Sequence, residues 1–425
     1  MNERLLQYIW QFRLFDNRSL FTTTGEPVEI IYQGQYNTNQ GPDFSNARIR
    51  IAGTTWAGHV ELHVRLSDWE KHHHQADRNY DNVILHVVWE ADETGPDIPA
   101  VELKGRVPGL FLERYEQLMK SGPSIPCGSQ LHLVDALTWK SWLDRLLAER
   151  MERKAGLVLH FNTESRNHWE ETAWWLLARN FGSKVNADAF EAIARSLPLS
   201  LLGRQAQLTA LEALLMGQAG LLETEKKEDP YYTLLQKEYR FLQKKHSLVP
   251  VDIPVHFLRM RPGNFPTIRL AQLAVFLYQT GASGRFFSAL LAAQQPDEIR
   301  RMFDLTANDY WHYHYSFDKT SAFKPKKSGD SLASLILINT VCPLLYAWGQ
   351  LNRENRVKEK ALDWLEKTPP EANHILSNFQ DLGLPVKNAA ESQAILELKN
   401  AYCTQKRCLD CMAGNRLLSK SATGR

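Results

Sequence analysis

The sequence has little net charge and few cysteines, and each scarcity excludes a class of protein. Its 50 Lys and Arg residues are balanced by 48 Asp and Glu residues, which leaves a formal charge of +2 over 425 residues. A nucleic-acid binding surface would therefore have to be a local patch, because the chain has no global excess of positive charge. The five cysteines, three of them close to the C-terminus, do not form a disulfide framework, so we expect a cytoplasmic protein.

Long hydrophobic runs are also missing. Residues 1–4 lead into a mixed polar and aromatic segment rather than the apolar core of a secretory signal. The most apolar window, 332–348, is interrupted by Asn339, Thr340 and Pro343, which makes it too short and too polar for a membrane span. We therefore expect no membrane association.

Several signatures of common enzymes are absent as well. The sequence contains no Walker phosphate loop, no dinucleotide-binding glycine fingerprint and no Gly-x-Ser-x-Gly elbow. Nucleotide-driven and serine-hydrolase chemistry are thus disfavoured. No internal period of roughly 20–50 residues is visible, which argues against a solenoid.

The first part of the chain predicts an α+β domain. Apolar residues follow helical spacing across residues 3–15. The sequence pattern then changes to short runs of β-forming residues separated by Gly, Asn and Asp. These runs cover residues 28–32, 47–51, 58–66, 83–89 and 100–103. A leading helix followed by such strands predicts a domain built on a mixed β-sheet.

Beyond residue 131 the pattern becomes helical. The main helix candidates cover residues 139–153, 168–181, 186–196, 206–216, 232–246, 268–280, 286–294 and 332–352. Because strand-like runs are nearly absent, we expect a larger α-rich domain. We divide the chain into an α+β domain (1–121), a connector (122–130), an α-helical domain (131–400) and a C-terminal cysteine segment (401–425).

Acidic and basic side chains gather on two of the predicted strands. Residues 58–66 alternate, so that apolar side chains point to one face while Glu61 and His63 point to the other. Asp43 follows Gly-Pro just before the preceding strand. Neighbouring strands would bring these three groups together, and two carboxylates with one imidazole suit a divalent cation and an activated water.

Motifs along nearly the whole chain resemble an uncharacterised bacterial family, a domain of unknown function. They are Glu-x-x-Leu-x-Tyr-Ile-Trp at 3–10, Gly-x-Val-Glu-Leu-His at 58–63, Arg-Pro-Gly-Asn-Phe-Pro-Thr-Ile-Arg at 261–269 and the terminal cysteines. This resemblance implies no particular activity.

The N-terminal domain is also loosely similar to the PD-(D/E)XK nuclease superfamily. That superfamily places an Asp on one strand, an (Asp/Glu)-x-Lys on the next and often a Glu on a preceding helix. The matching positions are Asp43, Glu61 and Glu3, with His63 in place of the usual Lys. The resemblance implies a restriction-endonuclease-like fold and a catalytic site that uses Mg²⁺ or Mn²⁺. A histidine in the last position can also ligate a transition metal, which Lys⁺ would repel.

A structural interpretation of the same residues stays open. Glu61 and His63 would then be solvated strand residues of an interaction domain, and Asp43 would occupy a Gly-Pro-Asp turn. His72–His74 and His86 could add metal or phosphate contacts. We favour the alternative, in which His72–His74 lie in an exposed loop and His86 lies in the core. The histidine triple lacks the i, i+4 spacing of a helical metal pair.

The cysteines form the most specific motif. Cys403-x4-Cys408-x2-Cys411 can close around one soft metal, and the fourth ligand we expect is Cys127, which we place as an exposed thiol in the connector. Cys342 lies in an apolar helix and is better explained as a core residue. The set resembles the iron–sulfur staple of some PD-(D/E)XK nucleases. A [4Fe–4S] cluster and a structural Zn²⁺ both fit four thiols, and reduced or redox-active thiols remain the alternative.

A basic and aromatic segment suggests nucleic-acid contacts. Arg259, Arg261 and Arg269 surround a Pro/Gly turn that enters a helix, where guanidinium groups can hold phosphate. The aromatic stretch 310–315 would add a stacking surface for a single strand. An interdomain corner whose arginines pair with acidic residues explains the same segment.

The leading hypothesis is a metal-dependent nuclease that acts on DNA or RNA, with a metal–thiolate staple. The alternative is a non-catalytic scaffold or adaptor with a structural metal. Oligomeric state and protein partners are not predicted by the sequence.

Overall fold

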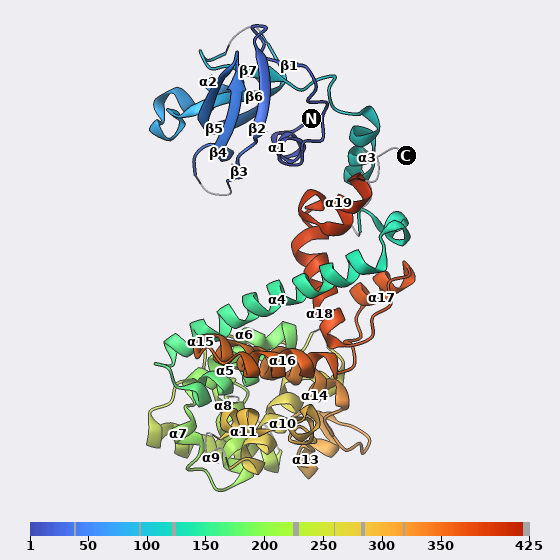
Figure 1. The fold of residues 1–425 in the computed structure, drawn as a ribbon. Helices are drawn as coiled ribbons and strands as arrows, with labels where there is room; N and C mark the ends of the chain where they lie inside the picture. Colours follow the sequence, from blue (N-terminus) through green and yellow to red (C-terminus); the bar gives the residue numbers. More distant parts are fainter. Residues whose placement is uncertain are drawn as a thin grey trace. The chain divides into compact units, whose positions relative to one another are not determined.

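The structure is a computed structural model that describes residues 1–37, 40–92, 95–120, 125–223, 229–258, 260–281, 285–317 and 319–419. The chain forms two compact units, and unit 1 combines residues 1–142 with 399–425 while unit 2 comprises 143–398. The predicted α+β class is confirmed, because a leading helix and a mixed sheet lie in unit 1 and helices fill unit 2 (Figure 1). In this division the C-terminal cysteine segment belongs to the same unit as the N-terminal sheet.

A mixed β-sheet is the centre of unit 1. Its strand order is β1 (Leu20–Phe21), β2 (Pro27–Tyr32), β4 (Phe44–Ile51), β5 (Thr54–Arg65), β6 (Val83–Glu90) and β7 (Ala100–Glu102), with β3 (Gln35–Tyr36) also paired to β4. The pairs from β1 to β5 are antiparallel, whereas β6 is parallel to both β5 and β7. Parallel neighbours require a crossover connection. It is made by α2 (Asp68–Lys71) and the 3₁₀ turns η1 (His74–Ala76) and η2 (Arg78–Tyr80).

Helix α1 (Glu3–Gln11) packs against β5. Asn2 caps its N-terminus, since the Asn2 side chain accepts a hydrogen bond from the backbone N–H of Leu5 (2.8 Å). The helix ends earlier than the predicted residue 15, because Arg13 adopts a left-handed conformation with φ of 50°. Its apolar face is buried and places the opposite face, with Glu3 and Gln7, beside the sheet edge that carries Asp43.

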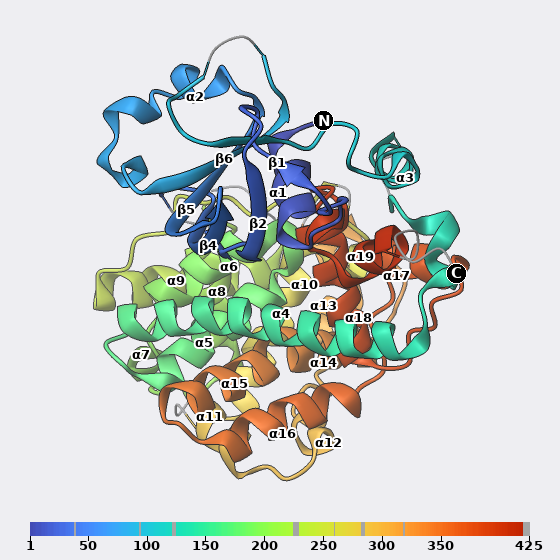
Figure 2. The ribbon, with the colours of Figure 1, turned by 45° about the horizontal axis from the view of Figure 1, so that its top comes forward.

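The second part of unit 1 joins segments from both ends of the chain. It contains α3 (Gly109–Lys120), η3 (Gly128–Leu133), the start of α4 (Ala136–Glu164), the π-helical turn η6 (Leu398–Cys403), the 3₁₀ turn η7 (Cys408–Asp410) and α19 (Met412–Ser419). Helix α19 packs against α3 and η3. Figure 1 shows α19 beside α3, and Figure 2 shows both helices from a second direction. A hydrogen bond from the Tyr8 hydroxyl to Asn415 Oδ1 (2.8 Å) connects α1 with α19.

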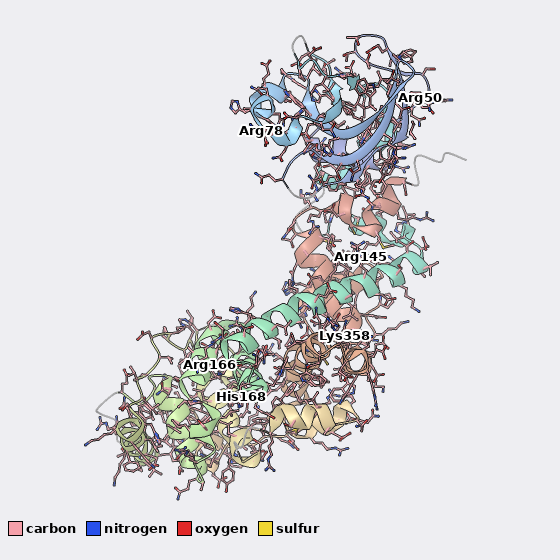
Figure 3. All side chains as sticks on the ribbon, turned by 60° about the vertical axis from the view of Figure 1, so that its left-hand side comes forward. Arg50, Arg78, Arg145, Arg166, His168 and Lys358 are labelled. Carbon is pink, nitrogen blue, oxygen red and sulfur yellow. The ribbon has the colours of Figure 1, made fainter. Side chains whose placement is uncertain are left out.

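Unit 2 is helical. After the remainder of α4 come α5 (Trp169–Phe181), α6 (Ser183–Ser196), α7 (Leu199–Leu202), α8 (Leu208–Gln218), α9 (Pro230–His246), η4 (Pro262–Asn264), α10 (Pro266–Gln279), α11 (Phe286–Ala292), α12 (Pro296–Arg301) and α13 (Asp309–His312). A hairpin of β8 (His314–Ser316) and β9 (Lys319–Thr320) precedes α14 (Asp330–Ile336), the π-helical turn η5 (Leu337–Val341), α15 (Cys342–Leu351), α16 (Asn355–Glu366), α17 (His374–Asp381) and α18 (Ala389–Glu397). Helix α8 contacts both α9 and α10, and α8 and α10 carry much of the core. His168, labelled in Figure 3, caps α5 by accepting a hydrogen bond from the backbone N–H of Glu171 (3.2 Å).

The most apolar stretch of the chain is a core element of unit 2. Asp330–Leu351, which comprises α14, η5 and α15, has the length and composition of a membrane-crossing helix, so the expectation that this stretch is too short and too polar is wrong. However, 78% of its most apolar window is buried inside the protein. That degree of burial is typical of the central helix of a folded core.

Candidate metal centre

Asp43 and Glu61 meet where β4 begins beside β5. The backbone N–H of Asp43 donates to Glu61 Oε2 (2.9 Å). Asp43 Oδ2 accepts from the backbone N–H of Leu62 (3.1 Å), and its Oδ1 accepts from Gln7 Nε2 on α1 (2.7 Å). The structure thus brings the two carboxyl groups together, and the negative charge of Glu3 acts on both of them.

The interpretation of Glu61 and His63 as solvated strand residues is wrong. Glu61 is 5% exposed and His63 is 1% exposed, although they lie on the polar face of β5. The alternating pattern gives the two faces correctly, but β5 is a central strand and both of its faces are covered at this point. Gly58 lies three residues before Glu61 on the same strand. It must be glycine for the backbone near Asn82 to pack this closely, because a Cβ at position 58 would lie 2.5 Å from the carbonyl oxygen of Asn82.

Burial and neighbouring negative charge disfavour ionisation of both carboxyl groups. Burial raises the pKa of Asp43 to about 7, and the charge of Glu3 raises it further while the hydrogen bond from Leu62 lowers it. Burial, followed by the charge of Asp43, raises the pKa of Glu61 to about 9. Groups in this situation are stabilised in their ionised form by a cation, and in the described part of the chain the side chains next to Glu61 are neutral imidazoles rather than Lys or Arg.

Three histidines surround the same point. His63 Nε2 lies 3.2 Å from His72 Nδ1 and 3.2 Å from His74 Nε2. Glu61 Oε1 lies 3.7 Å from His63 Nε2 and 3.4 Å from His74 Nε2. The ligand atoms of His63, His72 and His74 all lie within 4.8 Å of one another. We call Glu61, His63, His72 and His74 the histidine–glutamate site.

Local backbone geometry explains why His72 and His74, but not His73, face the sheet. His72 ends α2, and His73 then adopts a left-handed conformation with φ of 59° before His74 begins η1. This reversal turns the two flanking imidazoles to the same side. Tyr80 stacks on His74 with ring centroids 3.9 Å apart, which fixes the imidazole plane.

The expectation for the histidine segment is correct only in part. His72 and His73 are exposed, as expected of a loop, but the His74 side chain is only 10% exposed and belongs to the site. The buried core position expected for His86 is confirmed. His86 nevertheless contributes to the site, because its Nε2 lies 2.8 Å from His63 Nδ1.

The donor atoms of Glu61, His63 and His74 are spaced as the ligands of one transition-metal ion, and His72 Nδ1 lies next to His63 Nε2. Four ligands at about 2.1 Å from a tetrahedral ion are separated by roughly 3.4 Å, which matches the distances around His63 Nε2 and Glu61 Oε1. When Nδ1 of His63 carries its proton and donates to His86, the Nε2 lone pair is free to bind the ion. A metal-ligating histidine commonly has such a partner on its other nitrogen.

The imidazoles of His63 and His74 are already in their metal-binding form at neutral pH, because burial lowers the pKa of both. Burial lowers the pKa of His63 to about 3, and the nearby His86, His72 and His74 lower it further. Burial also lowers the pKa of His86 to about 4. Neutral imidazoles with carboxylate suit Zn²⁺, Mn²⁺ and related ions, whereas Mg²⁺ prefers an all-oxygen shell.

The four predicted cysteine ligands are all buried in unit 1. Cys127, Cys403, Cys408 and Cys411 are 6–8% exposed, so the expectation of an exposed Cys127 is wrong. Cys342 is fully buried at the start of α15, which confirms its interpretation as a core residue.

The basic segment of unit 2 divides into different environments. Arg259 lies outside the described residues, and Arg261 is exposed beside η4. Arg269 donates to Asn264 Oδ1 (2.7 Å) and to Gln272 Oε1 (3.0 Å), so part of its guanidinium holds its own turn, and burial lowers its pKa to about 10. The role of these three arginines in nucleic-acid binding remains a prediction.

The aromatic stretch 310–315 packs within unit 2. Trp311 is fully buried, and Tyr310 stacks between Tyr231 and His314 with centroid distances of 4.4 and 4.1 Å. The stretch therefore contributes core and hairpin contacts.

Comparison with known proteins assigns a family. No curated protein and no solved structure matches the chain. A family model described as "Protein of unknown function (DUF2851)" matches residues 3–374, which is most of the chain. The protein is therefore a member of this family of unknown function.

Proposed function

We propose that this protein is a metal-dependent hydrolase of phosphodiester bonds, with nucleic acid as substrate and the histidine–glutamate site as its metal centre. The observation that carries the proposal is the convergence of Glu61 Oε1, His63 Nε2 and His74 Nε2 at 3.2–3.7 Å spacings, with His72 Nδ1 3.2 Å from His63 Nε2 and the half-buried Asp43 hydrogen-bonded to Glu61. A divalent ion held there would polarise a phosphoryl oxygen and lower the pKa of a water molecule.

Each residue has a role that follows from its contacts. Glu61, His63, His72 and His74 would hold the ion, and His86 would orient His63. Asp43 is held by the N–H groups of Leu62 and Gln7, so its carboxyl group is positioned to bind a second ion or to accept a proton from water. Glu3 would add negative charge at the same place.

Support for a nucleic-acid substrate comes from the PD-(D/E)XK-like arrangement. Asp43 directly precedes β4, Glu61 lies on the antiparallel neighbour β5 with His63 at the i+2 position, and Glu3 is on the helix that packs on β5. Arg78 follows the histidine segment (Figure 3), and because it is exposed it is available to contact a phosphate group. The reduced state of all five cysteines suits the cytoplasm, which is part of the proposal.

A structural metal is the second candidate. Four protein ligands can complete a tetrahedral shell and leave no open position for substrate, which is typical of structural sites. In that case the ion would hold the α2–η1 crossover against β5, and the chain would act as a scaffold.

The test uses purified full-length protein with labelled single- and double-stranded DNA and RNA, in the presence of Mn²⁺, Zn²⁺, Mg²⁺ or a chelator. We expect cleavage that depends on the metal and falls by about 10²–10⁴-fold in Asp43→Asn, which leaves the histidine–glutamate site intact. His74→Asn should abolish metal-dependent cleavage, whereas the matched variant His73→Asn should retain it, because Asn tolerates the left-handed conformation at position 73. Cleavage that is absent in the wild type, or equal in His74→Asn and His73→Asn, contradicts the proposal. Metal binding without cleavage favours the structural site.

A further inference from the structure

Four buried thiols gather in the second part of unit 1. Cys127 directly precedes η3, Cys403 ends η6, Cys408 begins η7 and Cys411 directly precedes α19. Helix α19 packs on η3, which brings the two segments into contact even though unit 2 separates them in the sequence. All four cysteines are free and buried.

The four sulfur atoms are close enough to influence one another. After burial, the charges of Cys411 and Cys408 raise the pKa of Cys127, which reaches about 12. Burial and then the charges of the other three cysteines raise the pKa of Cys403. This mutual influence places the four sulfur atoms near one another in the interior of unit 1.

The backbone around these residues is shaped to close on a small volume. Between Cys403 and Cys408 the chain turns through Lys406, which has a left-handed φ of 51°. A Cβ on Gly414 would lie 2.1 Å from the carbonyl oxygen of Cys408, so only glycine permits the first turn of α19 to approach η7 this closely. The N–H groups of Ala413 and Gly414 donate to the Cys411 sulfur, although burial raises the pKa of this thiol overall.

The guanidinium groups of Arg407 and Arg416 each lie against a carboxylate. Arg407 Nε donates to Asp410 Oδ2 (2.8 Å), and Arg416 Nε lies 3.3 Å from Asp135 Oδ2. Lys406 Nζ donates to the carbonyl oxygen of Met119 (2.6 Å). Its charge lowers the pKa of Cys408, but burial and the charge of Cys411 raise that pKa by more. A metal cation is the charge that would balance four thiolates.

We propose that Cys127, Cys403, Cys408 and Cys411 bind one soft metal centre, a zinc ion or an iron–sulfur cluster, which fastens the two chain segments of unit 1 together. The x4 and x2 spacings of the last three ligands, with a distant fourth, occur in iron–sulfur proteins, and four thiolates also suit structural zinc. Soft thiolates distinguish this centre from the histidine–glutamate site, so the two proposals stand or fall separately.

The experiment measures metal bound to anaerobically purified full-length protein in a Glu61→Gln background, which removes a ligand from the other site. We expect either about one zinc per chain, or iron with acid-labile sulfide and visible absorption of an iron–sulfur cluster. X-ray absorption at the metal edge should show sulfur neighbours at about 2.3 Å. Cys408→Ser should lose the metal, whereas Cys342→Ala, which removes the thiol of the unit 2 core, should keep it.

The absorption measurement does not depend on whether the Cys408→Ser variant folds. A protein that contains no metal, or a metal with only nitrogen and oxygen neighbours, overturns the proposal. Equal metal content in Cys408→Ser and Cys342→Ala overturns it as well. A chain mass lowered by disulfide formation, with no bound metal, would show that the thiols pair with each other instead.

Discussion

Replacement of Glu61 by Gln should change the stability of the protein in opposite directions with and without metal. The side chain keeps its shape, so the hydrogen bond from the N–H of Asp43 can remain. The substitution removes a buried carboxyl group whose pKa is raised to about 9 by burial and by Asp43. It also removes one ligand of the histidine–glutamate site.

The size of the metal-free effect follows from the raised pKa. A raised folded pKa means that the folded state holds a proton that the unfolded chain releases, so stability is present below about pH 4.5 and is lost as the pH rises toward 9. One pKa unit corresponds to about 1.4 kcal/mol. At pH 7 the metal-free protein would therefore gain roughly 3 kcal/mol of unfolding free energy when Glu61 becomes Gln.

The metal effect has the opposite sign. A ligand present at 100 times its dissociation constant stabilises the folded state by about 2.7 kcal/mol. For a folded unit of this size, that shifts the unfolding midpoint by roughly 5–11 °C. Wild-type protein should show this shift with Zn²⁺ or Mn²⁺, and Glu61→Gln should show little of it.

Thermal unfolding followed by circular dichroism, with chelator and with metal, measures both effects. The matched control is Glu70→Gln, which removes the same charge from an exposed position of α2 and should change neither quantity. If Glu61→Gln is as strongly stabilised by metal as the wild type, Glu61 is not a ligand. If the metal-free variant is less stable than the wild type, the inferred cost of burying this carboxyl group is wrong.

Three further predictions concern unit 2. Burial raises the pKa of Glu212 to about 7. The contribution of Glu212 to stability therefore falls as the pH rises from about 4.5 through 7. In urea unfolding, the difference in unfolding free energy between about pH 5 and pH 8 should be smaller for Glu212→Gln than for the wild type. Burial lowers the pKa of Lys154 to about 7. Between pH 7 and about 10.5 the unfolded chain therefore binds more protons than the folded protein, so stability rises with pH over this range. This rise should disappear in Lys154→Met. Gly217→Ala should cost roughly 1–3 kcal/mol in thermal unfolding, because a Cβ there would lie 2.2 Å from the Tyr239 ring.

The elements that the sequence predicts well are those with a strong local signal. The leading helix has an Asn cap and a regular apolar face, and the five longer strands of the sheet coincide with β-rich runs bounded by turn residues. Each helix predicted for unit 2 overlaps an observed one within the described residues, whereas α16, α17 and α18 are not predicted. Alternation along β5 also predicted correctly that Glu61 and His63 share a face.

The histidine part of the site could not be read from the sequence. Its formation depends on the left-handed conformation of His73 and on a parallel pairing of β5 with β6 that brings His86 beside His63. Neither feature follows from local residue preferences, and three consecutive histidines lack helical metal spacing. Burial of Glu61 on the polar face of a strand likewise depends on tertiary packing, which alternation alone does not report.

The central claim is that one metal ion lies between Glu61 and the three imidazoles. The most direct measurement is anomalous diffraction from crystals grown with Zn²⁺ or Mn²⁺, with data collected on both sides of the metal absorption edge. We predict an anomalous peak about 2.0–2.3 Å from Glu61 Oε1, His63 Nε2, His72 Nδ1 and His74 Nε2. Well-ordered side chains at these positions without a peak between them, at a metal concentration that saturates binding in solution, would contradict the claim.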